Sequence, residues 1–586
     1  MSTSWFMYHT GEDPFAFPVG PKELKLRLFV QGGLELSCMV LHGDRYDSPG
    51  LESPIKMTHR GSAGTHDIYE AIIYASEKRS RYLFYAENDK GQYQWFGERG
   101  ASVNRDLAGS FQYAYMHHPE AIQLPSWVEH AIVYQIFPDS FSRGELDSSV
   151  QIKQQLSHSS MYGGTLQGIK EKIEYLRQLG VTVIYMTPVF HSPSNHKYNT
   201  TDYYEVDPSF GDTEMLKQLV ETAHQHGIKV LLDAVFNHTG DTFFAFQDVM
   251  EKGVNSSYTD WYFIDHFPVT QLPVPNYETF GKSEAYMPKL NLYHPEAIDY
   301  MLDVAKYWIQ EVGIDGWRLD VANEVNHEFW KKLRDTIKGL DPELLLIGEI
   351  MHSSGPWLRG DEFDGGMNYL FRDVVIDFFA KQSIGPVSFS EQIIRFESLY
   401  NDQANRAMFQ LIGSHDTERF LTVCENGGRG WNRKESANAR MMLAVFFQFT
   451  SLGIPMIYYG DEVGMRGGAD PDCRRPMIWE ETGWNATLNN WYRLLIRQRN
   501  SHASLRRGSF RFWFADEARN VLGYLRQDGE EIMGLLINLS PNSYTLELET
   551  YRNDKESLVD LLSGRVFPNA EKLKVTVDEY GCCMLL

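Results

Sequence analysis

The sequence predicts an α/β protein with a (β/α)8 TIM barrel, an inserted loop domain after the third barrel strand, and a β-sandwich domain at each end. Between about residues 130 and 503, short apolar runs alternate with amphipathic stretches of helical period, as in parallel strands joined by helices. The flanking regions instead alternate polar and apolar residues between Gly and Pro turns, which is typical of antiparallel β-domains. A chain of 586 residues is also too long for one compact core.

The first predicted domain, residues 1–123, is a small β-sandwich. Its clearest strand candidates are residues 24–30, 68–74 and 81–85, and no long helical period separates them. Pro125-Ser126-Trp127 marks the boundary with the barrel, which we assign to residues 124–236 and 293–503.

The barrel region contains about eight strand candidates. They are residues 132–137, 181–186, 229–235, 317–322, 344–349, 363–369, 409–412 and 454–459. Helices are predicted over residues 166–179, 213–226, 295–312 and 327–340. Asp212 is suited to cap the second of these helices, Pro295 to begin the third and Gly313 to end it.

Two insertions depart from this repeat. Residues 237–292 follow the third strand and are rich in aromatic and turn residues, so we predict an inserted B domain on the active face. Residues 425–431 form a Gly-rich loop. Strand alternation returns at 521–525 and 533–537, which predicts a C-terminal β-sandwich over residues 504–586.

Composition excludes several classes of partner. A formal charge of −23 argues against nucleic acid or an anionic membrane, because both need a basic surface, and it suits a neutral ligand. Aromatic residues make up 13%, enough to supply either stacking surfaces for sugar rings or an ordinary large core. Five scattered cysteines, no signal peptide and no long apolar segment predict a cytoplasmic protein.

Polar residues collect where the predicted strands end. They are Asp233 and Asn237-His238 after the third strand, Arg318 and Asp320 in the fourth, Glu349 after the fifth, and His415-Asp416 after the seventh. In a (β/α)8 barrel these ends share one face, which carries the active site. An isolated Arg-x-Asp is usually a structural ion pair and an isolated His a core residue. Three carboxyl groups from three strands favour a functional site.

This set of groups suits glycosidic bond cleavage, which needs one carboxyl group as acid and another as nucleophile or base. A third can hold the substrate and raise the pKa of a neighbour by repulsion. Arg318, two residues before Asp320, would keep that carboxylate ionised, and His238 and His415 can donate to sugar hydroxyl groups.

These segments carry a family resemblance. Asp233-Ala-Val-Phe-Asn-His238, Gly316-Trp-Arg-Leu-Asp-Val-Ala-Asn-Glu324, Gly348-Glu349-Ile350 and Ser414-His-Asp-Thr-Glu-Arg419 resemble the four conserved regions of the α-amylase family. Met287-Pro-Lys-Leu-Asn291 resembles the fifth region of its neopullulanase, cyclomaltodextrinase and maltogenic amylase subgroup. His191 to Tyr198 and Tyr458 to Glu462 agree, and the likeness covers nearly the whole chain.

The resemblance implies a retaining mechanism with Asp320 as nucleophile, Glu349 as acid/base and Asp416 as transition-state stabiliser. The other residues it implies bind substrate. They are His238, Arg318 and His415 around the reacting sugar, Asp470 and Arg474 at the next sugar on the non-reducing side, Tyr198, Phe280 and Trp357 as stacking surfaces, and Glu324 near the acceptor.

No cofactor is required by this chemistry, and calcium is the one candidate ion. Some relatives hold calcium in a loop rich in Asn and Asp, but the matching stretch here reads Phe141-Ser-Arg-Gly-Glu-Leu-Asp-Ser-Ser149, with Thr165 after Gly163-Gly164. The loop lacks oxygen ligands and Arg143 adds a positive charge, so we predict that this site is absent or weak. Region III also has Met351 where an aromatic residue is common.

The predicted protein is therefore an α-glucan hydrolase acting on α-1,4 bonds of cyclodextrins, maltooligosaccharides and possible larger substrates such as pullulan or starch, with some transglycosylation. The resemblance also implies a homodimer in which the N-terminal domain of one subunit covers the active site of the other. Two alternatives stay open: a dedicated α-glucan transferase, and a non-catalytic carbohydrate-binding protein. The presence of Asp320, Glu349 and Asp416 argues against the second alternative.

Overall fold

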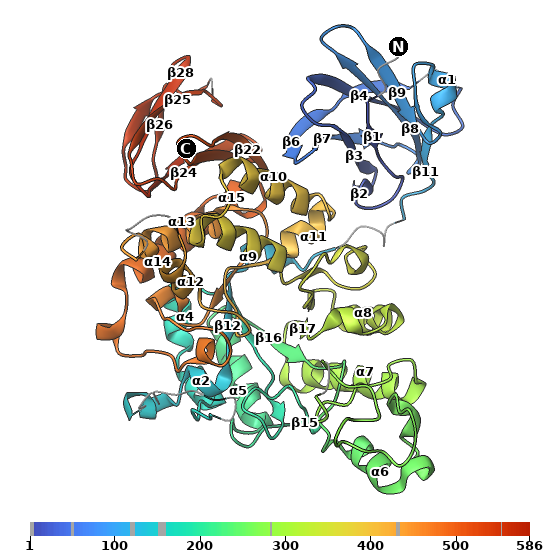
Figure 1. Cartoon of the computed structure of the whole chain (residues 1–586), viewed down its shortest axis with the longest axis vertical. Coiled ribbons are helices and arrows are strands. Elements are labelled where there is room, and N and C mark those ends of the chain that lie inside the picture. The colour runs from blue at the N-terminus through green and yellow to red at the C-terminus, as the bar shows by residue number, and fades with distance from the viewer. Residues whose placement is uncertain are drawn as a thin grey trace.

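A computed structural model shows the architecture of the chain. It describes residues 5–48, 52–117, 123–149, 157, 160–281, 284–428, 434–552 and 554–586. Figure 1 shows the N-terminal and C-terminal β-domains side by side at one end of the molecule and the barrel below them. The insertion that carries α6 (Phe244–Lys252) lies at the opposite end.

The N-terminal region is a sandwich of two antiparallel sheets, as predicted. One sheet has the order β1 (Met7–Tyr8), β3 (Glu23–Gln31), β7 (His66–Tyr74), β6 (Thr58–Ala63), with β2 (Ala16–Gly20) paired to β3. The other has the order β10 (Gly100–Ser102), β9 (Tyr93–Gly97), β8 (Ser80–Asn88), β4 (Leu36–Gly43), β5 (Ser53–Lys56), with β11 (Phe111–Tyr113) paired to β8. Alternate side chains of β3, including Leu24, Leu26 and Leu28, pack between the sheets.

The central region is a parallel eight-stranded barrel. Its strands are β12 (Val133–Ile136), β13 (Val183–Met186), β16 (Lys229–Ala234), β17 (Gly316–Leu319), β18 (Leu345–Gly348), β19 (Gly365–Gly366), β20 (Phe409–Leu411) and β21 (Ile454–Tyr458). Their order follows the chain, β21 pairs back with β12, and one parallel bridge between Met367 and Phe409 closes the seam between β19 and β20. All eight strand candidates are confirmed.

Helices surround the barrel, and they include the four that the sequence predicts, the first of which is divided in two. They are α2 (Pro138–Phe141), α3 (Leu166–Glu171), α4 (Ile173–Leu179), α5 (Thr213–Gln225), α7 (Pro295–Val312), α8 (His327–Leu340), α9 (Tyr369–Val375), α10 (Pro386–Glu397), α11 (Asp402–Ala407), α12 (Phe420–Asn426), α13 (Ala437–Thr450), α14 (Ala486–Ser501) and α15 (Ala503–Arg507). The Asp212 carboxylate accepts from Met215 N at the start of α5, and Gly313 ends α7 with φ 80°.

Three elements differ from their predicted bounds. The strand expected over 363–369 is confined to β19, and Tyr369 already begins α9. The helix expected over 166–179 is broken at Lys172, whose ψ of 2° separates α3 from α4. The strand expected over 317–322 stops at Leu319, because Val321 has the left-handed φ of 44° and turns the chain. Asp320 therefore lies at the mouth of the barrel rather than within the strand.

The insertion between β16 and α7 contains α6 and a set of isolated bridges, one of which joins His238 to Lys289. Of the predicted loop at 425–431, residues 425 and 426 end α12, and residues 429–431 lie outside the described ranges.

The C-terminal region has the sheet order β22 (Ser509–Asp516), β23 (Val521–Asp528), β24 (Glu531–Asn538), β29 (Cys582–Leu585). Two ladders face it, namely β25 (Tyr544–Glu549) with β28 (Lys572–Val577) and β26 (Ser557–Val559) with β27 (Val566–Pro568). Among the helices that the structure describes, none is long and apolar enough to cross a bilayer.

Candidate active site

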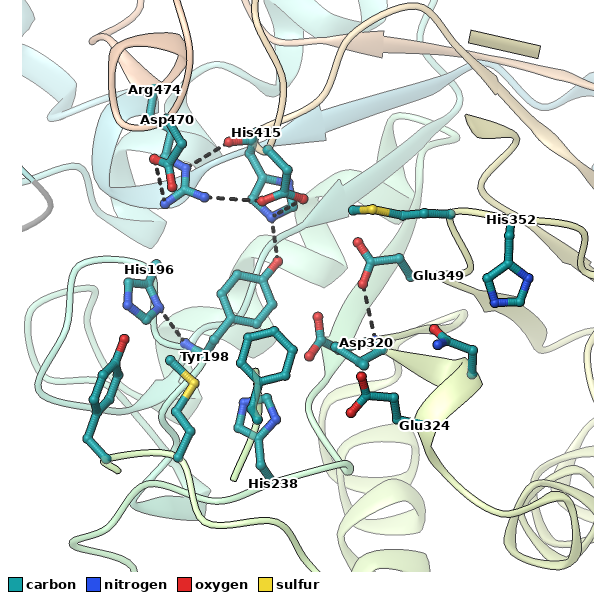
Figure 2. Close-up of a pocket in the computed structure, with 17 residues that line it drawn as sticks. His196, Tyr198, His238, Asp320, Glu324, Glu349, His352, His415, Asp470 and Arg474 are labelled. Atoms are coloured by element: carbon teal, nitrogen blue, oxygen red, sulfur yellow. Dashed lines mark hydrogen bonds and ion pairs between the residues drawn. The ribbon is translucent and has the colours of Figure 1, made fainter. Parts of the chain in front are cut away.

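A cavity of about 510 Å³ opens at the carboxyl ends of the barrel strands, between the barrel and the insertion. Figure 2 shows its polar lining converging from several segments of the chain. The lining residues are His196, Tyr198, His238, Phe280, Tyr286, Met287, Asp320, Val321, Asn323, Glu324, Glu349, Met351, His352, His415, Asp416, Asp470 and Arg474.

The Arg318 guanidinium lies beneath this cavity and joins three carboxyl groups. Its Nη1 donates to Asp320 Oδ1 at 2.8 Å and to Asp233 Oδ1 at 2.8 Å, and its Nη2 contacts Glu349. Val321 N donates to Glu349 Oε2 at 3.1 Å, so the backbone turn after β17 also holds this carboxyl group. These contacts fix Asp320 and Glu349 beside each other.

Burial is the main cause of the shifted pKa values of the carboxyl groups in this site. Burial raises the pKa values of Asp320, Glu349 and Asp416, although the nearby guanidinium groups act in the opposite direction. Burial also raises the pKa of Asp233 to about 6. The raised pKa of Glu349 favours the protonated form that a general acid requires.

A chain of hydrogen bonds links Gln135, His415 and Tyr198 to the carboxyl group of Asp233. Gln135 Nε2 lies 2.8 Å from His415 Nδ1, so the ring carries its proton on Nε2, which is 2.6 Å from Tyr198 Oη. Tyr198 Oη in turn donates to Asp233 Oδ2 at 3.1 Å. Burial, together with Arg474 and Arg318, lowers the pKa of His415 well below its ordinary value, so the ring is neutral at neutral pH.

Asp416 lies beside His415 and is held by the loop that follows β21. His415 Nε2 is 3.2 Å from Asp416 Oδ2, and Arg474 Nη2 donates to Asp416 Oδ1 at 3.1 Å. Arg474 also pairs with Asp470 at 3.2 Å. Figure 2 shows Asp470 and Arg474 across the cavity from Glu324.

The insertion supplies the opposite wall. The His238 ring stacks on Phe280 with ring centroids 4.9 Å apart, and burial lowers the His238 pKa to about 3. Lys289 Nζ donates to Asn237 Oδ1 at 2.6 Å and lies 3.4 Å from Glu324 Oε2. The isolated bridge between His238 and Lys289 thus aligns the insertion with the barrel.

The structure brings most of the predicted site residues to this cavity. Ten of the predicted residues line it, namely Asp320, Glu349, Asp416, His238, His415, Tyr198, Phe280, Glu324, Asp470 and Arg474. Arg318 is a correction, because its side chain is fully buried and holds carboxylates instead of facing a ligand. Trp357 is another, because its ring is 8% exposed and packs against His327 and His352, outside the lining.

The other lining residues were not predicted as site residues. They are His196, Tyr286, Met287, Val321, Asn323, Met351 and His352. His196 lies in a segment that the sequence singled out, and its Nδ1 accepts from Tyr198 N at 3.1 Å. His352 follows the predicted acid Glu349 by three residues, and this short separation in the sequence could have identified it as a site residue. Tyr286 immediately precedes Met287, the first residue of the motif that resembles the fifth region of the subgroup.

The loop expected to resemble a calcium site is held by ion pairs. Asp147 accepts from Ser142 Oγ and lies 2.9 Å from Lys172 Nζ, while the Ser148 and Ser149 side chains are outside the described part of the structure. Within the described residues, no group of three or more His, Cys, Asp or Glu could hold a metal ion. The weak or absent calcium site stays a prediction.

Comparisons with known proteins cover the full length. Family models described as "Alpha amylase, catalytic domain", "Alpha amylase, N-terminal ig-like domain" and "Maltogenic Amylase, C-terminal domain" match residues 135–507, 5–117 and 510–584. The chain is 44% identical to "Neopullulanase 2" of Thermoactinomyces vulgaris over 584 residues, which is 98% of each chain. It is 43% identical to a "Cyclomaltodextrinase" of Thermoanaerobacter pseudethanolicus over 95% of each chain. A solved structure titled "Cyclomaltodextrinase" matches with a TM-score of 0.91, at 36% identity over 99% of each chain.

Proposed function

This chain belongs to the α-amylase family, in its neopullulanase, cyclomaltodextrinase and maltogenic amylase subgroup, and we propose that it hydrolyses α-1,4 bonds of cyclodextrins and maltooligosaccharides with retention of configuration. The observation that carries the proposal is the joining of Asp320 and Glu349 by Arg318 at the floor of a cavity that Asp416 also lines. Retaining hydrolysis uses two such carboxyl groups, and the third can bind the distorted sugar.

In the first step, Asp320 attacks the anomeric carbon while Glu349 gives its proton to the departing glycosidic oxygen. The new bond joins the carboxylate oxygen to the sugar, and the old bond leaves with its electron pair on the protonated oxygen. Arg318 holds Asp320 Oδ1, which leaves Oδ2 for the attack. Burial and then the charge of Asp416 raise the pKa of Glu349, which favours its acid form.

In the second step, Glu349 takes a proton from water and the resulting oxygen attacks the same carbon. The ester to Asp320 breaks, and both carboxyl groups return to their starting forms. Neutral His238, stacked on Phe280, can donate to a sugar hydroxyl without adding charge, whereas the single proton of neutral His415 is directed at Tyr198 Oη.

A sugar hydroxyl can replace water in this step, so we include transglycosylation in the proposal. Glu324 supports it because its carboxylate lines the cavity near Lys289, on the side where an acceptor would enter. A dedicated transferase would redistribute chain lengths without a net gain of reducing ends, whereas the proposed hydrolase increases them.

The substrate preference is tested by initial rates on γ- or β-cyclodextrin and on soluble starch, with products separated by chain length. We expect faster ring opening that ends in maltose and glucose. Starch as the better substrate would contradict the proposed preference and the covered cleft that goes with it.

We extend the proposal to a cytoplasmic homodimer built through the N-terminal domain. Support comes from apolar side chains that stay exposed on the first sheet beside its contact with the barrel, where Tyr8, Ile72 and Tyr74 are 45%, 52% and 61% exposed. All five cysteines are free, as a reducing compartment would keep them. Sedimentation of the full chain tests the dimer, and replacing Ile72 and Tyr74 by Asp should shift it to monomer.

A further inference from the structure

The loop that follows β18 forms one wall of the cavity and is held from behind. Glu349, Met351 and His352 line the cavity, and Figure 2 shows His352 on the side of Glu324, across the carboxyl groups from Asp470 and Arg474. The regular structure of the loop before β19 is one short 3-10 turn, η7 (Gly355–Trp357), so residues packed behind the loop help to hold its shape.

The support comes from the segment between α10 and α11. Ser354 N donates to Tyr400 Oη at 3.2 Å, and Asn401 Nδ2 donates to Leu358 O at 3.0 Å. Ser354, Tyr400 and Asn401 are all buried, with exposures of 1%, 2% and 4%. The loop that carries His352 is thus fixed by two hydrogen bonds from residues about 45 positions further along the chain.

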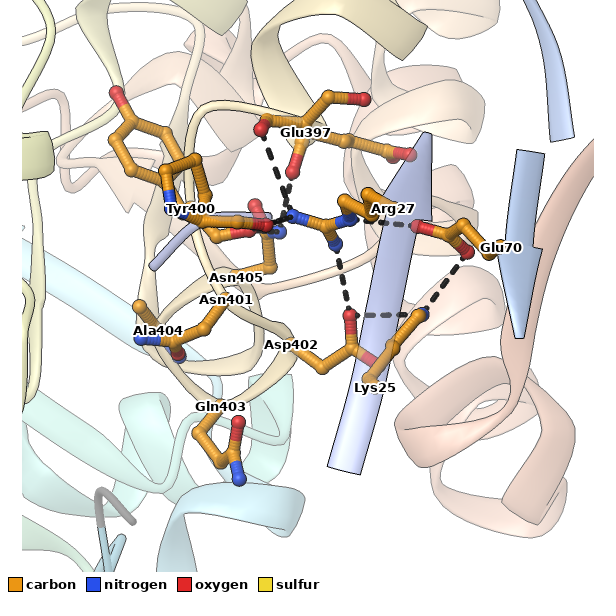
Figure 3. A network of polar contacts seen from close by, with 12 residues as sticks. Lys25, Arg27, Glu70, Glu397, Tyr400, Asn401, Asp402, Gln403, Ala404 and Asn405 are labelled. Carbon is orange, nitrogen blue, oxygen red and sulfur yellow. Dashed lines mark hydrogen bonds and ion pairs between the residues drawn. The ribbon is translucent and has the colours of Figure 1, made fainter. Parts of the chain in front are cut away.

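The supporting segment is itself held by the N-terminal domain of the same chain. Arg27 on β3 is 1% exposed, and its Nη1 donates to Tyr400 O at 2.5 Å. Its Nη2 donates to Asp402 Oδ1 at 3.0 Å, and its Nε donates to Glu70 Oε1 at 2.6 Å. One planar guanidinium therefore joins two strands of the N-terminal sheet to the barrel (Figure 3).

Charges at this junction are matched. Lys25 Nζ lies 3.0 Å from Glu70 and 2.9 Å from Asp402, and Arg60 pairs with Glu397. Burial would raise the pKa values of Glu70 and Asp402, but the surrounding cations outweigh it and lower both. Glu70 and Asp402 therefore join the N-terminal domain to the barrel through ion pairs and hydrogen bonds, although burial raises the pKa of the neighbouring Glu397.

We propose that Arg27 is a positioning residue for substrate: through Tyr400 and Ser354 it fixes the cavity wall that receives the sugar units on the leaving-group side. The inference rests on the proposed hydrolysis of α-glucans. The N-terminal domain then acts on the active site of its own chain, in addition to any role between subunits. Substrates with a sugar in the leaving group depend on Arg27, and substrates with a small aryl leaving group do not.

The test compares Arg27→Gln with Arg60→Gln in the full chain. Both variants remove one cation from the same junction, but Arg60 pairs with Glu397 and donates to Phe510 O, whereas Arg27 donates to Tyr400 O and Asp402. For each enzyme, kcat/KM is measured on maltotetraose and on 4-nitrophenyl α-maltoside, and the melting temperature is recorded. We expect Arg27→Gln to lower the maltotetraose to aryl maltoside ratio about fivefold and Arg60→Gln to leave it unchanged.

Tyr400→Phe gives a second route if Arg27→Gln does not fold. It removes only the hydroxyl that accepts from Ser354 N and keeps the carbonyl that receives Arg27. It should lower the same ratio about two- to threefold, and Arg27→Gln combined with it should lower the ratio by less than the product of the two single effects.

The outcomes separate the two proposals. A wild-type enzyme inactive on both substrates would overturn the proposed function. An active wild type whose ratio is unchanged in Arg27→Gln and Tyr400→Phe, or is lowered equally in Arg60→Gln, would overturn this inference alone.

Discussion

Arg318 under the cavity and Arg27 at the domain junction are both buried and surrounded by carboxyl groups. The pKa values of these carboxyl groups shift in opposite directions at the two places. Around Arg318 the acids are in excess, and burial raises the pKa values of Asp233, Asp320 and Glu349. Around Arg27 two further cations are present, and the pKa values of Glu70 and Asp402 are lowered. The ratio of acids to cations decides whether a buried network can hold a mobile proton or only fixed charges.

Asp320→Asn should have the largest effect on this comparison. It removes the attacking oxygen and one acid from the excess around Arg318, so we expect kcat on maltooligosaccharides to fall by about 10³-fold or more. Binding of maltotetraose, measured by calorimetry, should persist. Asp373→Asn is the control, since Asp373 is 62% exposed and pairs with Arg372 on the outside of the barrel. Residual activity near wild type would contradict the role of Asp320.

Replacing each of the two arginines by Lys tests the difference between the active site and the domain junction. Lys cannot contact Asp233, Asp320 and Glu349 together, so Arg318→Lys should lower kcat by about 10²-fold. Arg27→Lys should instead lower the free energy of unfolding by about 1–3 kcal/mol while kcat on the aryl maltoside stays within about twofold. Calorimetric melting and initial rates measure the two effects. Equal losses of kcat in both variants would contradict the distinction.

Asp416→Asn should move the pH profile. After burial and the opposing Arg318, the charge of Asp416 is what raises the pKa of Glu349, and losing it lowers that pKa. Because activity needs protonated Glu349, the residual kcat should begin to fall at a lower pH than in the wild type. If kcat of Asp416→Asn begins to fall at the same basic pH as kcat of the wild type, Asp416 does not act on the pKa of Glu349.

Glu70→Gln should have the smallest effect, confined to stability. The pKa of Glu70 is lower in the folded protein than its unfolded value of about 4.3, so its contribution is present above that pH and is lost as the pH falls. Melting temperatures from about pH 5 down to about pH 3 should therefore decrease less steeply in Glu70→Gln than in the wild type. The matched variant Glu547→Gln alters an exposed pair with Lys574 and should keep the wild-type slope. Parallel slopes for Glu70→Gln and the wild type would contradict the charge balance at the junction.

The sequence allowed the barrel and most of its site to be predicted, because both depend on local patterns. Each strand is a short apolar run, and Asp320, Glu349 and Asp416 follow such runs directly. The end of β17 was missed because the left-handed turn at Val321 has no glycine to signal it. The burial of Trp357 was missed because packing decides which face of an aromatic ring is covered.

The junction around Arg27 was out of reach for a different reason. Arg27 and Asp402 are separated by 375 positions, and each looks like an ordinary surface charge in its own segment. Only the docking of the N-terminal sheet against α11 brings them together. An ion pair between residues this far apart in the chain leaves no periodic pattern in a single sequence.

The barrel closes through its shortest strand. β19 has two residues, and a single bridge from Met367 to Phe409 completes the seam beside the loop that Tyr400 supports. Few backbone hydrogen bonds must break there for the ring of strands to part, so local opening should begin at this seam. Amide hydrogens around residues 365–367 should then exchange with solvent earlier than those of β13 or β16.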